Sequence, residues 1–308
     1  MLERWHWIKD VTVNWAHKIH LPFFDGLSLY DVASFFFKGI IEGRVTNRAA
    51  SVSWSFFLAL FPGILFLFTL IPFFPIEGLQ AEIFEVFRRV LPPDTYDATR
   101  STIDDILNNK RSGLLSFGFI FALIFATNGT NSLISNFNDS IHELEGRSFW
   151  RQQLVSGLLT IVLVITFIVG IILIIFSSNI LNDLLSFFRL ERISPTLIEL
   201  LRFALLLILI LYSISVLYFY GPTKTREWRF LSPGAILATT LILIGSFGFS
   251  YYVSNFSQYN KLYGSIGTLL VIMLWIYLNA IVLIIGFELN ASLAKAKKTQ
   301  KQKQIPFS

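Results

Sequence analysis

The sequence lacks cysteine altogether and carries little charge. Its 308 residues include no Cys, four His and only 15% charged residues, whereas hydrophobic residues make up 54%. Without Cys the chain can form no disulfide, no thiol nucleophile and no thiolate metal site. Soluble domains carry about 25% charged residues, so this composition excludes a domain that hides all of its apolar surface in one aqueous core.

Sequence motifs of the common catalytic sites are also missing. His142 and Glu143 begin like the helix of a zinc protease, but the position of the required second His is Gly146. The segment YGSIG at 263–267 lacks the spacing of a nucleophile elbow. The chain has neither a Walker loop nor a glycine-rich dinucleotide fingerprint. We therefore expect no catalytic residue, no metal site and no cofactor.

The hydrophobic residues are gathered in long runs. A helix needs about 20 apolar residues to cross a hydrocarbon core of about 30 Å. Six runs reach this length: 49–75, 113–136, 152–177, 198–220, 231–254 and 265–289. The sequence therefore predicts an all-α, polytopic membrane protein with six transmembrane helices. In the fifth run, Gly234 and Ala238 have the spacing of small residues at which two helices approach closely.

The distribution of Lys and Arg predicts the orientation of the spans. If the N-terminus is cytoplasmic, 16 of the 25 basic residues fall in cytoplasmic segments and nine fall in outer segments. Basic residues are in excess in cytoplasmic loops, so we expect both termini on the cytoplasmic side. The net charge of +5 is then a topology signal, and we expect no nucleic-acid partner.

The segments outside the spans have helical patterns of their own. Two apolar stripes predict amphipathic helices in the N-terminal segment, which either lie on the membrane or cap the bundle. The loop 76–112, after the first span, predicts two further helices outside the cytoplasm. The expected parts of the chain are the N-terminal segment 1–48, a transmembrane domain over 49–290 and a basic cytoplasmic tail over 291–308.

A polar stripe interrupts the second span. Asn128, Asn131, Ser135, Asn138 and His142 are spaced three, four, three and four residues apart, so they share one face of a helix. Asn128 and Asn131 fall within the length that crosses the bilayer, where an amide without partners costs several kcal/mol. This face must therefore meet other helices or water.

The first and sixth spans carry matching polar positions. Asn279 lies near the middle of the sixth span, and Ser55 and Thr69 share one face of the first span. Pro62 and Gly63, which lie between these two, predict a helix kink and a freed backbone carbonyl. We expect the polar faces of spans one, two and six to face one another.

Two interpretations of these polar faces stay open at this point. In the first, they form hydrogen bonds between helices, each worth about 0.6–2 kcal/mol. In the second, they line a hydrated cavity, open toward the cytoplasm, that binds or passes a polar group. Four polar positions in series on one span favour the cavity. Its candidate substrate contacts are Asn128, Asn131, Ser135, Asn279, Ser55 and Thr69.

Charged residues border the spans. Glu288 ends the apolar run of the sixth span, which predicts an interfacial carboxylate near Lys295 rather than a proton relay. Arg147 and Arg151 flank an aromatic pair before the third span, where they either bind lipid phosphate or anchor the topology. Arg202 opens the fourth span and is expected to reach the outer headgroups.

Three segments carry a resemblance to a known family. They are YGSIGTLLVIMLWIYLNAIVLIIGFELNASL (263–293), RAASVSWSFFLALFPGILFLF (48–68) and GRSFWRQQL (146–154). Over about residues 28–293 the chain resembles the YihY/BrkB family of bacterial inner-membrane proteins, which implies six spans with both termini inside. Members of that family have been labelled virulence factors, transporter-like proteins and a ribonuclease, and some are linked to envelope lipid export. The segment YGPTKTREWRF departs from the family pattern.

The residues and the resemblance together predict an inner-membrane protein that binds and transports a polar or amphipathic substrate, such as an envelope lipid. Its expected partners are membrane lipids, that substrate and a second copy of the chain. The alternative is an envelope scaffold that transports nothing and recruits partners through its N-terminal helices and outer loop. A membrane ribonuclease is a distant third, because no group in this sequence is suited to activate a water beside a phosphodiester.

Overall fold

The chain folds into helices. The structure is a computed structural model that describes residues 28–73, 84–85, 100–101, 103–105, 109–141, 147–187, 195–223, 230–255 and 265–304. This part of the chain contains no strand, which confirms the predicted all-α class. Its main elements are α2 (Leu29–Glu42), α3 (Val45–Leu70), η2 (Ile71–Phe73), α6 (Ser112–Ile141), α7 (Phe149–Phe187), α8 (Pro195–Tyr220), α9 (Pro233–Asn255) and α11 (Ser265–Gln304).

Among the described residues, six helices are long and apolar enough to cross a membrane, as the sequence predicted. Most of them begin or end a few residues beyond the apolar runs. The reason is that hydropathy marks only the hydrocarbon layer, whereas a hydrogen-bonded helix can continue into the headgroup region. The candidate spans are Val45–Phe73, Ser112–Ile141, Phe149–Ile174, Glu199–Tyr220, Pro233–Ser254 and Gly267–Thr299.

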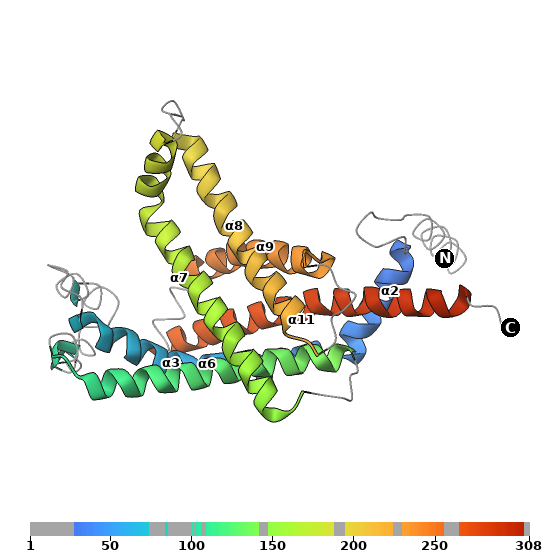
Figure 1. The fold of residues 1–308 in the computed structure, drawn as a ribbon, viewed down its shortest axis with the longest axis horizontal. Helices are drawn as coiled ribbons and strands as arrows, with labels where there is room; N and C mark the ends of the chain where they lie inside the picture. Colours follow the sequence, from blue (N-terminus) through green and yellow to red (C-terminus); the bar gives the residue numbers. More distant parts are fainter. Residues whose placement is uncertain are drawn as a thin grey trace.

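The helices form two groups that cross steeply (Figure 1). α3 and α6 lie side by side with opposite directions and form the most extensive helix pair, and α11 packs along α3. α7 and α8 form a hairpin that crosses this layer and extends away from it. α9 packs against both α8 and α11 and so links the two groups.

Small residues bring α3 and α6 together. A Cβ on Gly118 would lie 3.2 Å from the backbone of Phe66, and a Cβ on Gly129 would lie 3.0 Å from the ring of Phe56. Close backbone approach at small residues is the usual basis of helix association in membranes, where lipid tails are as apolar as Leu.

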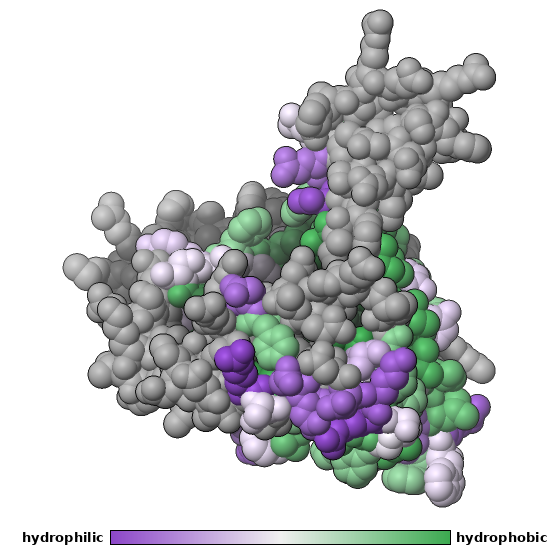
Figure 2. Space-filling model, turned by 90° about the vertical axis from the view of Figure 1, so that its left-hand side faces the viewer, coloured by the Kyte–Doolittle hydropathy of each residue, from purple (hydrophilic) through white to green (hydrophobic). Residues whose placement is uncertain are grey.

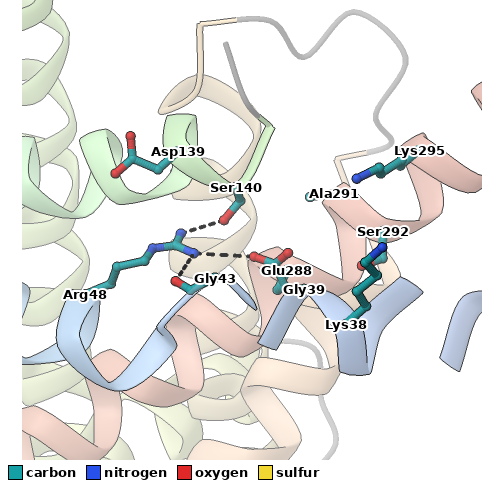
Figure 3. Close-up of a pocket in the computed structure, with 10 residues that line it drawn as sticks. All are labelled: Lys38, Gly39, Gly43, Arg48, Asp139, Ser140, Glu288, Ala291, Ser292 and Lys295. Carbon is teal, nitrogen blue, oxygen red and sulfur yellow. Dashed lines mark hydrogen bonds and ion pairs between the residues drawn. The ribbon is translucent and has the colours of Figure 1, made fainter. Parts of the chain in front are cut away.

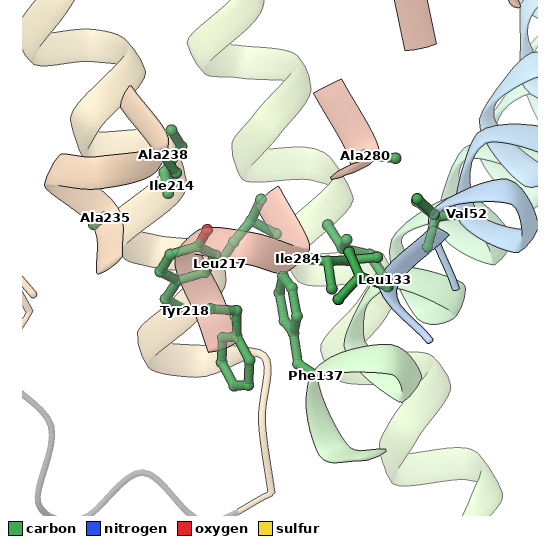
Figure 4. Close-up of a cluster of buried hydrophobic side chains, with 13 residues drawn as sticks. Val52, Leu133, Phe137, Ile214, Leu217, Tyr218, Ala235, Ala238, Ala280 and Ile284 are labelled. Carbon is green, nitrogen blue, oxygen red and sulfur yellow. The ribbon is translucent and has the colours of Figure 1, made fainter. Parts of the chain in front are cut away.

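The core lies where α3, α6, α8, α9 and α11 meet (Figure 4). The rings of Phe137 and Phe287 stack with their centroids 4.2 Å apart, and Tyr218 meets both rings edge-on at 5.4 Å. The hydroxyl of Tyr218 donates a hydrogen bond of 2.6 Å to the carbonyl of Leu283. A buried hydroxyl needs such a partner, so α8 is tied to α11 at this level.

The closest helix approach joins α9 to α11. A Cβ on Gly234 would overlap the carbonyl of Gly286, and a Cβ on Gly286 would lie 2.7 Å from that of Ala238. The side chain of Asn290 accepts a hydrogen bond of 2.8 Å from the backbone N–H of Gly234 and donates one of 2.8 Å to Ser232. Gly234 and Ala238 therefore lie where α9 packs closely against α11.

The last helix extends further than its apolar run. The sequence predicted a span ending near residue 289, whereas α11 continues to Gln304. The residues after 290 are mostly Ala, Lys and Gln, which are good helix formers. α2 packs against this extension: Val32, only 2% exposed, lies in a cluster with Leu289, Leu293 and Ala296. One face of α2 therefore packs against the bundle.

At the end of the molecule opposite α2, α3 ends and α6 begins. Figure 2 shows hydrophilic surface gathered on this end beside a hydrophobic flank. Exposed polar residues here include Asn109, Lys110 and Arg111, just before α6, as expected where a span leaves the hydrocarbon. Residues 1–27 of the N-terminal segment and most of the loop 76–112 lie outside the described residues.

Candidate functional site

The polar stripe on α6 is divided between two environments. Asn131 is half-buried, and its amide oxygen accepts hydrogen bonds from Gln152 (2.9 Å) and Ser156 (3.3 Å) of α7. Asn128 and Ser135, on the same face, are exposed. Asn131 therefore connects two spans, whereas Asn128 and Ser135 remain accessible from outside the protein.

Two further polar contacts join α6 to neighbouring elements, as Asn131 does. Thr160 of α7 donates a hydrogen bond of 2.8 Å to Thr130. Toward the end of α6, the amide oxygen of Asn138 accepts bonds from the backbone N–H (2.9 Å) and the hydroxyl (3.3 Å) of Thr223. The partners of this stripe thus come from α7 and from the segment after α8, rather than from α3 or α11. His142 lies outside the described residues.

The polar candidates on α3 and α11 bond within their own helices. The amide of Asn279 donates to the carbonyl of Trp275 at 2.8 Å. The hydroxyls of Ser55 and Thr69 donate to carbonyls four residues earlier, at 3.1 and 2.9 Å. Such bonds satisfy a polar side chain inside a membrane without a second helix. These bonds of Ser55, Thr69 and Asn279 thus join none of the three side chains to the polar stripe of α6.

The proline of the first span does not end its helix. α3 runs from Val45 to Leu70 with Pro62 inside it. Because proline has no N–H, the carbonyl of Leu58 loses its usual helical partner. A Cβ on Gly63 would meet nothing within 4 Å, so this glycine leaves open space beside the proline. Flexing at Pro62 and Gly63 stays a prediction.

Arg147 holds the end of α8. Its guanidinium donates to the carbonyls of Gly221 (2.6 Å), Pro222 (2.8 Å) and Tyr220 (3.2 Å). A cation at a helix C-terminus satisfies carbonyls that lack helical donors and matches the helix dipole. Burial lowers the pKa of Arg147, and the nearby charge of Arg151 lowers it further. Lipid contact by Arg151, which is exposed, and by Arg202, which is half-buried, stays a prediction.

A polar cavity of about 250 Å³ opens where α2, α3, α6 and α11 converge (Figure 3). In this view Arg48 enters the cavity from one side, while Lys38 and Lys295 lie on the other. The lining residues are Lys38, Gly39, Gly43, Arg48, Asp139, Ser140, Glu288, Ala291, Ser292 and Lys295. Four separate helices therefore contribute charged or polar side chains to one space.

Arg48 is the centre of this site. Its guanidinium donates to the hydroxyl of Ser140 (2.5 Å), to the carbonyl of Gly43 (3.4 Å) and to the carbonyl of Asn136. It also forms an ion pair of 3.5 Å with Glu288, and the two side chains are only 12% and 8% exposed. Arg48 thus ties the first turn of α3 to the end of α6 and to α11.

Local backbone geometry allows this convergence. Arg44, between α2 and α3, has a left-handed backbone with φ of 46°, which turns the chain sharply before α3 starts. Gly39 of α2 lies directly against the carboxylate of Glu288, where any Cβ would overlap it. A side chain at position 39 would therefore displace Glu288 from the cavity.

The buried pair is incompletely satisfied. Nε of Arg48 and Oε2 of Glu288 have no hydrogen-bond partner within the described structure, although Oε2 faces the guanidinium at 3.5 Å. Buried polar atoms normally have partners, so this pair keeps hydrogen-bonding capacity that the described residues do not use. With three cations, Lys38, Arg48 and Lys295, against two carboxylates, the cavity suits an anionic or zwitterionic group.

Sequence reasoning did not identify Arg48 as the partner of Glu288. One signal was available, because the predicted topology puts the start of span one and the end of span six at the same membrane surface. Arg48 and Glu288 are the charged residues that border those two apolar runs. In the part of the chain that the structure describes, no group of three His, Cys, Asp or Glu side chains could hold a metal ion.

Comparisons with known proteins give one family. The family model described as virulence factor BrkB matches residues 36–306. The chain is 35% identical to the ribonuclease-like protein YfkH of Bacillus subtilis (strain 168), over 83% of this chain and 92% of that protein. It is also similar to UPF0761 membrane proteins of Alteromonas mediterranea (26% identical, 90% and 92% covered) and Haemophilus influenzae (24% identical, 87% and 96% covered). No solved structure matches it.

Proposed function

This chain belongs to the virulence factor BrkB family of membrane proteins, and we propose that it binds a polar or amphipathic substrate in the cavity beside Arg48 and Glu288 and moves it across the membrane. The observation that carries the proposal is the cavity itself. Charged side chains from α2, α3, α6 and α11 surround about 250 Å³ at the end of three spans. A purely structural contact between these helices would need no such space.

The chemistry of the cavity supports a charged headgroup as the bound part. At about 30 Å³ for each water in the liquid, 250 Å³ corresponds to about eight waters, or one small polar group. Lys38 and Lys295 add positive charge opposite the Arg48–Glu288 pair. Lys ammonium and Arg guanidinium groups bind phosphate and carboxylate strongly when water is partly excluded. Apolar tails of the same substrate would remain among the exposed hydrophobic side chains of the spans.

The polar face of α6 supports a path that continues from the cavity. Asp139 and Ser140 line the cavity, and Ser135 and Asn128 follow on α6, both exposed. An exposed amide or hydroxyl facing lipid tails would lack partners, so this strip suits the passage of polar groups. Asn131, by contrast, accepts hydrogen bonds from α7 and is a poor candidate for direct substrate contact.

The proposal includes an orientation. The end that holds the cavity also holds α2 and the basic extension of α11. An excess of Lys and Arg favours the cytoplasmic side, so the cavity would open toward the cytoplasm in a bacterial inner membrane. We propose no catalytic activity.

The alternative function is a scaffold that transports nothing. The hydrogen bonds from Gln152 of α7 to Asn131 and from Thr223 to Asn138 favour it, because they use two residues of the polar stripe to hold elements together. Under this alternative, polar substitutions would change stability and partner retention, and the cavity would hold only solvent.

Native mass spectrometry of the protein in mild detergent tests the proposal. Lys295→Ala removes a cation that lines the cavity, and Lys298→Ala removes an exposed Lys from the same helix that does not line it. We expect the wild type and Lys298→Ala to retain a discrete lipid or metabolite that Lys295→Ala loses. Asn128→Leu should keep the bound species but lower transport in vesicles. Bare protein in all spectra would favour the scaffold.

A further inference from the structure

α2 has a second apolar face, whose side chains are exposed. Its inner face carries Val32 and Phe36 against α11. On the other side, Tyr30, Phe37 and Ile41 are spaced seven and four residues apart and so form one stripe. Phe37 is 60% exposed and Ile41 is 77% exposed. α2 is an apolar helix too short to cross a bilayer.

Chain connectivity fixes where this stripe can lie. Only Gly43 and Arg44 separate α2 from the first span, which starts at Val45. That span has 29 residues, or about 43 Å of helix at 1.5 Å per residue, whereas the hydrocarbon core is about 30 Å thick. The first turn of α3 carries the polar residues Thr46, Asn47 and Arg48, so the surplus length includes this turn, which stands in the headgroup region with α2 beside it.

The surroundings of α2 are basic. Lys38 and Arg44 lie on or beside α2, and Lys295, Lys297 and Lys298 follow on the part of α11 that continues past the apolar run. Against them stand four acidic residues, Asp31 and Glu42 of α2 and Asp139 and Glu288 of the cavity, so basic residues remain in excess. Basic residues beside an apolar helix face attract anionic lipid headgroups to that face.

We infer that α2 is an interfacial helix whose stripe of Tyr30, Phe37 and Ile41 lies in the boundary between headgroups and acyl chains of an anionic leaflet. Its other face carries Gly39 against Glu288, so α2 holds the mouth of the cavity at headgroup level. The lipid contact does not depend on substrate binding, since it rests only on the exposed stripe, its level and its charge.

The absence of cysteine makes the inference directly testable, because single-cysteine variants can be spin-labelled in an otherwise unchanged chain. Labels at Phe37→Cys and Ile41→Cys are examined in vesicles of phosphatidylcholine and phosphatidylglycerol. Collision rates with oxygen, which concentrates in lipid, are compared with those of a water-soluble nickel chelate. Phe61→Cys, exposed on α3 within its span, gives the lipid reference, and Lys298→Cys gives the water reference.

The expected result is that oxygen collisions exceed nickel collisions at Phe37→Cys and Ile41→Cys, as at Phe61→Cys, and that the ratio inverts at Lys298→Cys. Val32→Cys, on the packed face, should be protected from both reagents. Nickel access at 37 and 41 equal to that at 298 would overturn the inference, because α2 would then face water. Protection from both reagents at 37 and 41 would also overturn it, since a protein partner or a second copy would then cover the stripe.

Discussion

Breaking the ion pair between Arg48 and Glu288 should destabilise the protein strongly, because the remaining charge would stay buried. The two groups lie 3.5 Å apart, and their side chains are 12% and 8% exposed. At an effective dielectric constant of about 20, two unit charges at this distance attract by about 5 kcal/mol. Desolvation offsets much of this attraction, but removal of one partner from a buried pair still costs about 3–5 kcal/mol.

The two single substitutions should differ in a defined order. Glu288→Gln leaves the guanidinium of Arg48 with its bonds to Ser140 and to the carbonyls of Gly43 and Asn136, so we expect a loss near 3 kcal/mol. Arg48→Gln removes all of these bonds and leaves a buried carboxylate, so the loss should approach 5 kcal/mol.

A double-mutant cycle measures the coupling. The variant with both substitutions has no buried charge at this site, so its loss should be smaller than the sum of the single losses by about 0.5–3 kcal/mol. Denaturant unfolding in mixed micelles, followed by the fluorescence of the seven Trp residues, gives each free energy of unfolding. Lys298→Gln, on the exposed face of α11, should stay within about 0.5 kcal/mol of the wild type. Single losses below about 1 kcal/mol, or losses that simply add, would refute the reasoning.

Three further predictions use other parts of the molecule. Gly234→Ala should lower the free energy of unfolding by about 1–3 kcal/mol, because it overpacks α9 against α11. Gly245→Ala, on the same helix, adds a Cβ that meets nothing within 4 Å and should not destabilise the protein. The unfolding assay above measures both effects. Arg147→Gln should cost about 1–3 kcal/mol by leaving carbonyls after α8 without a donor, seen as a lower denaturant midpoint. A hydrogen bond from Arg111 lowers the pKa of Asp105 below 3.8, so this contact is complete above pH 3.8 and is lost as the pH falls through the lowered pKa. Asp105→Asn should therefore reduce hydrogen-exchange protection before α6 at neutral pH, and unchanged protection would contradict the contact.

The polar residues show where prediction from sequence ends. The spacing of Asn128, Asn131, Ser135 and Asn138 correctly placed them on one helix, α6. It did not determine their neighbours: Asn131 and Asn138 bond to α7 and Thr223, while the other two are exposed. Helical periodicity fixes which residues share a face, but not which element that face meets.

The sequence alone determined the class, the number of spans and the family resemblance. A bilayer requires each span to satisfy its own backbone hydrogen bonds over about 20 apolar residues, and this requirement is local and can be read directly from the chain. The cavity and its ion pair depended on the tertiary structure, because Arg48 and Glu288 are 240 residues apart in the sequence. Their meeting depends on the rotation and crossing of several helices, which the sum of many small packing contacts sets and no single segment encodes.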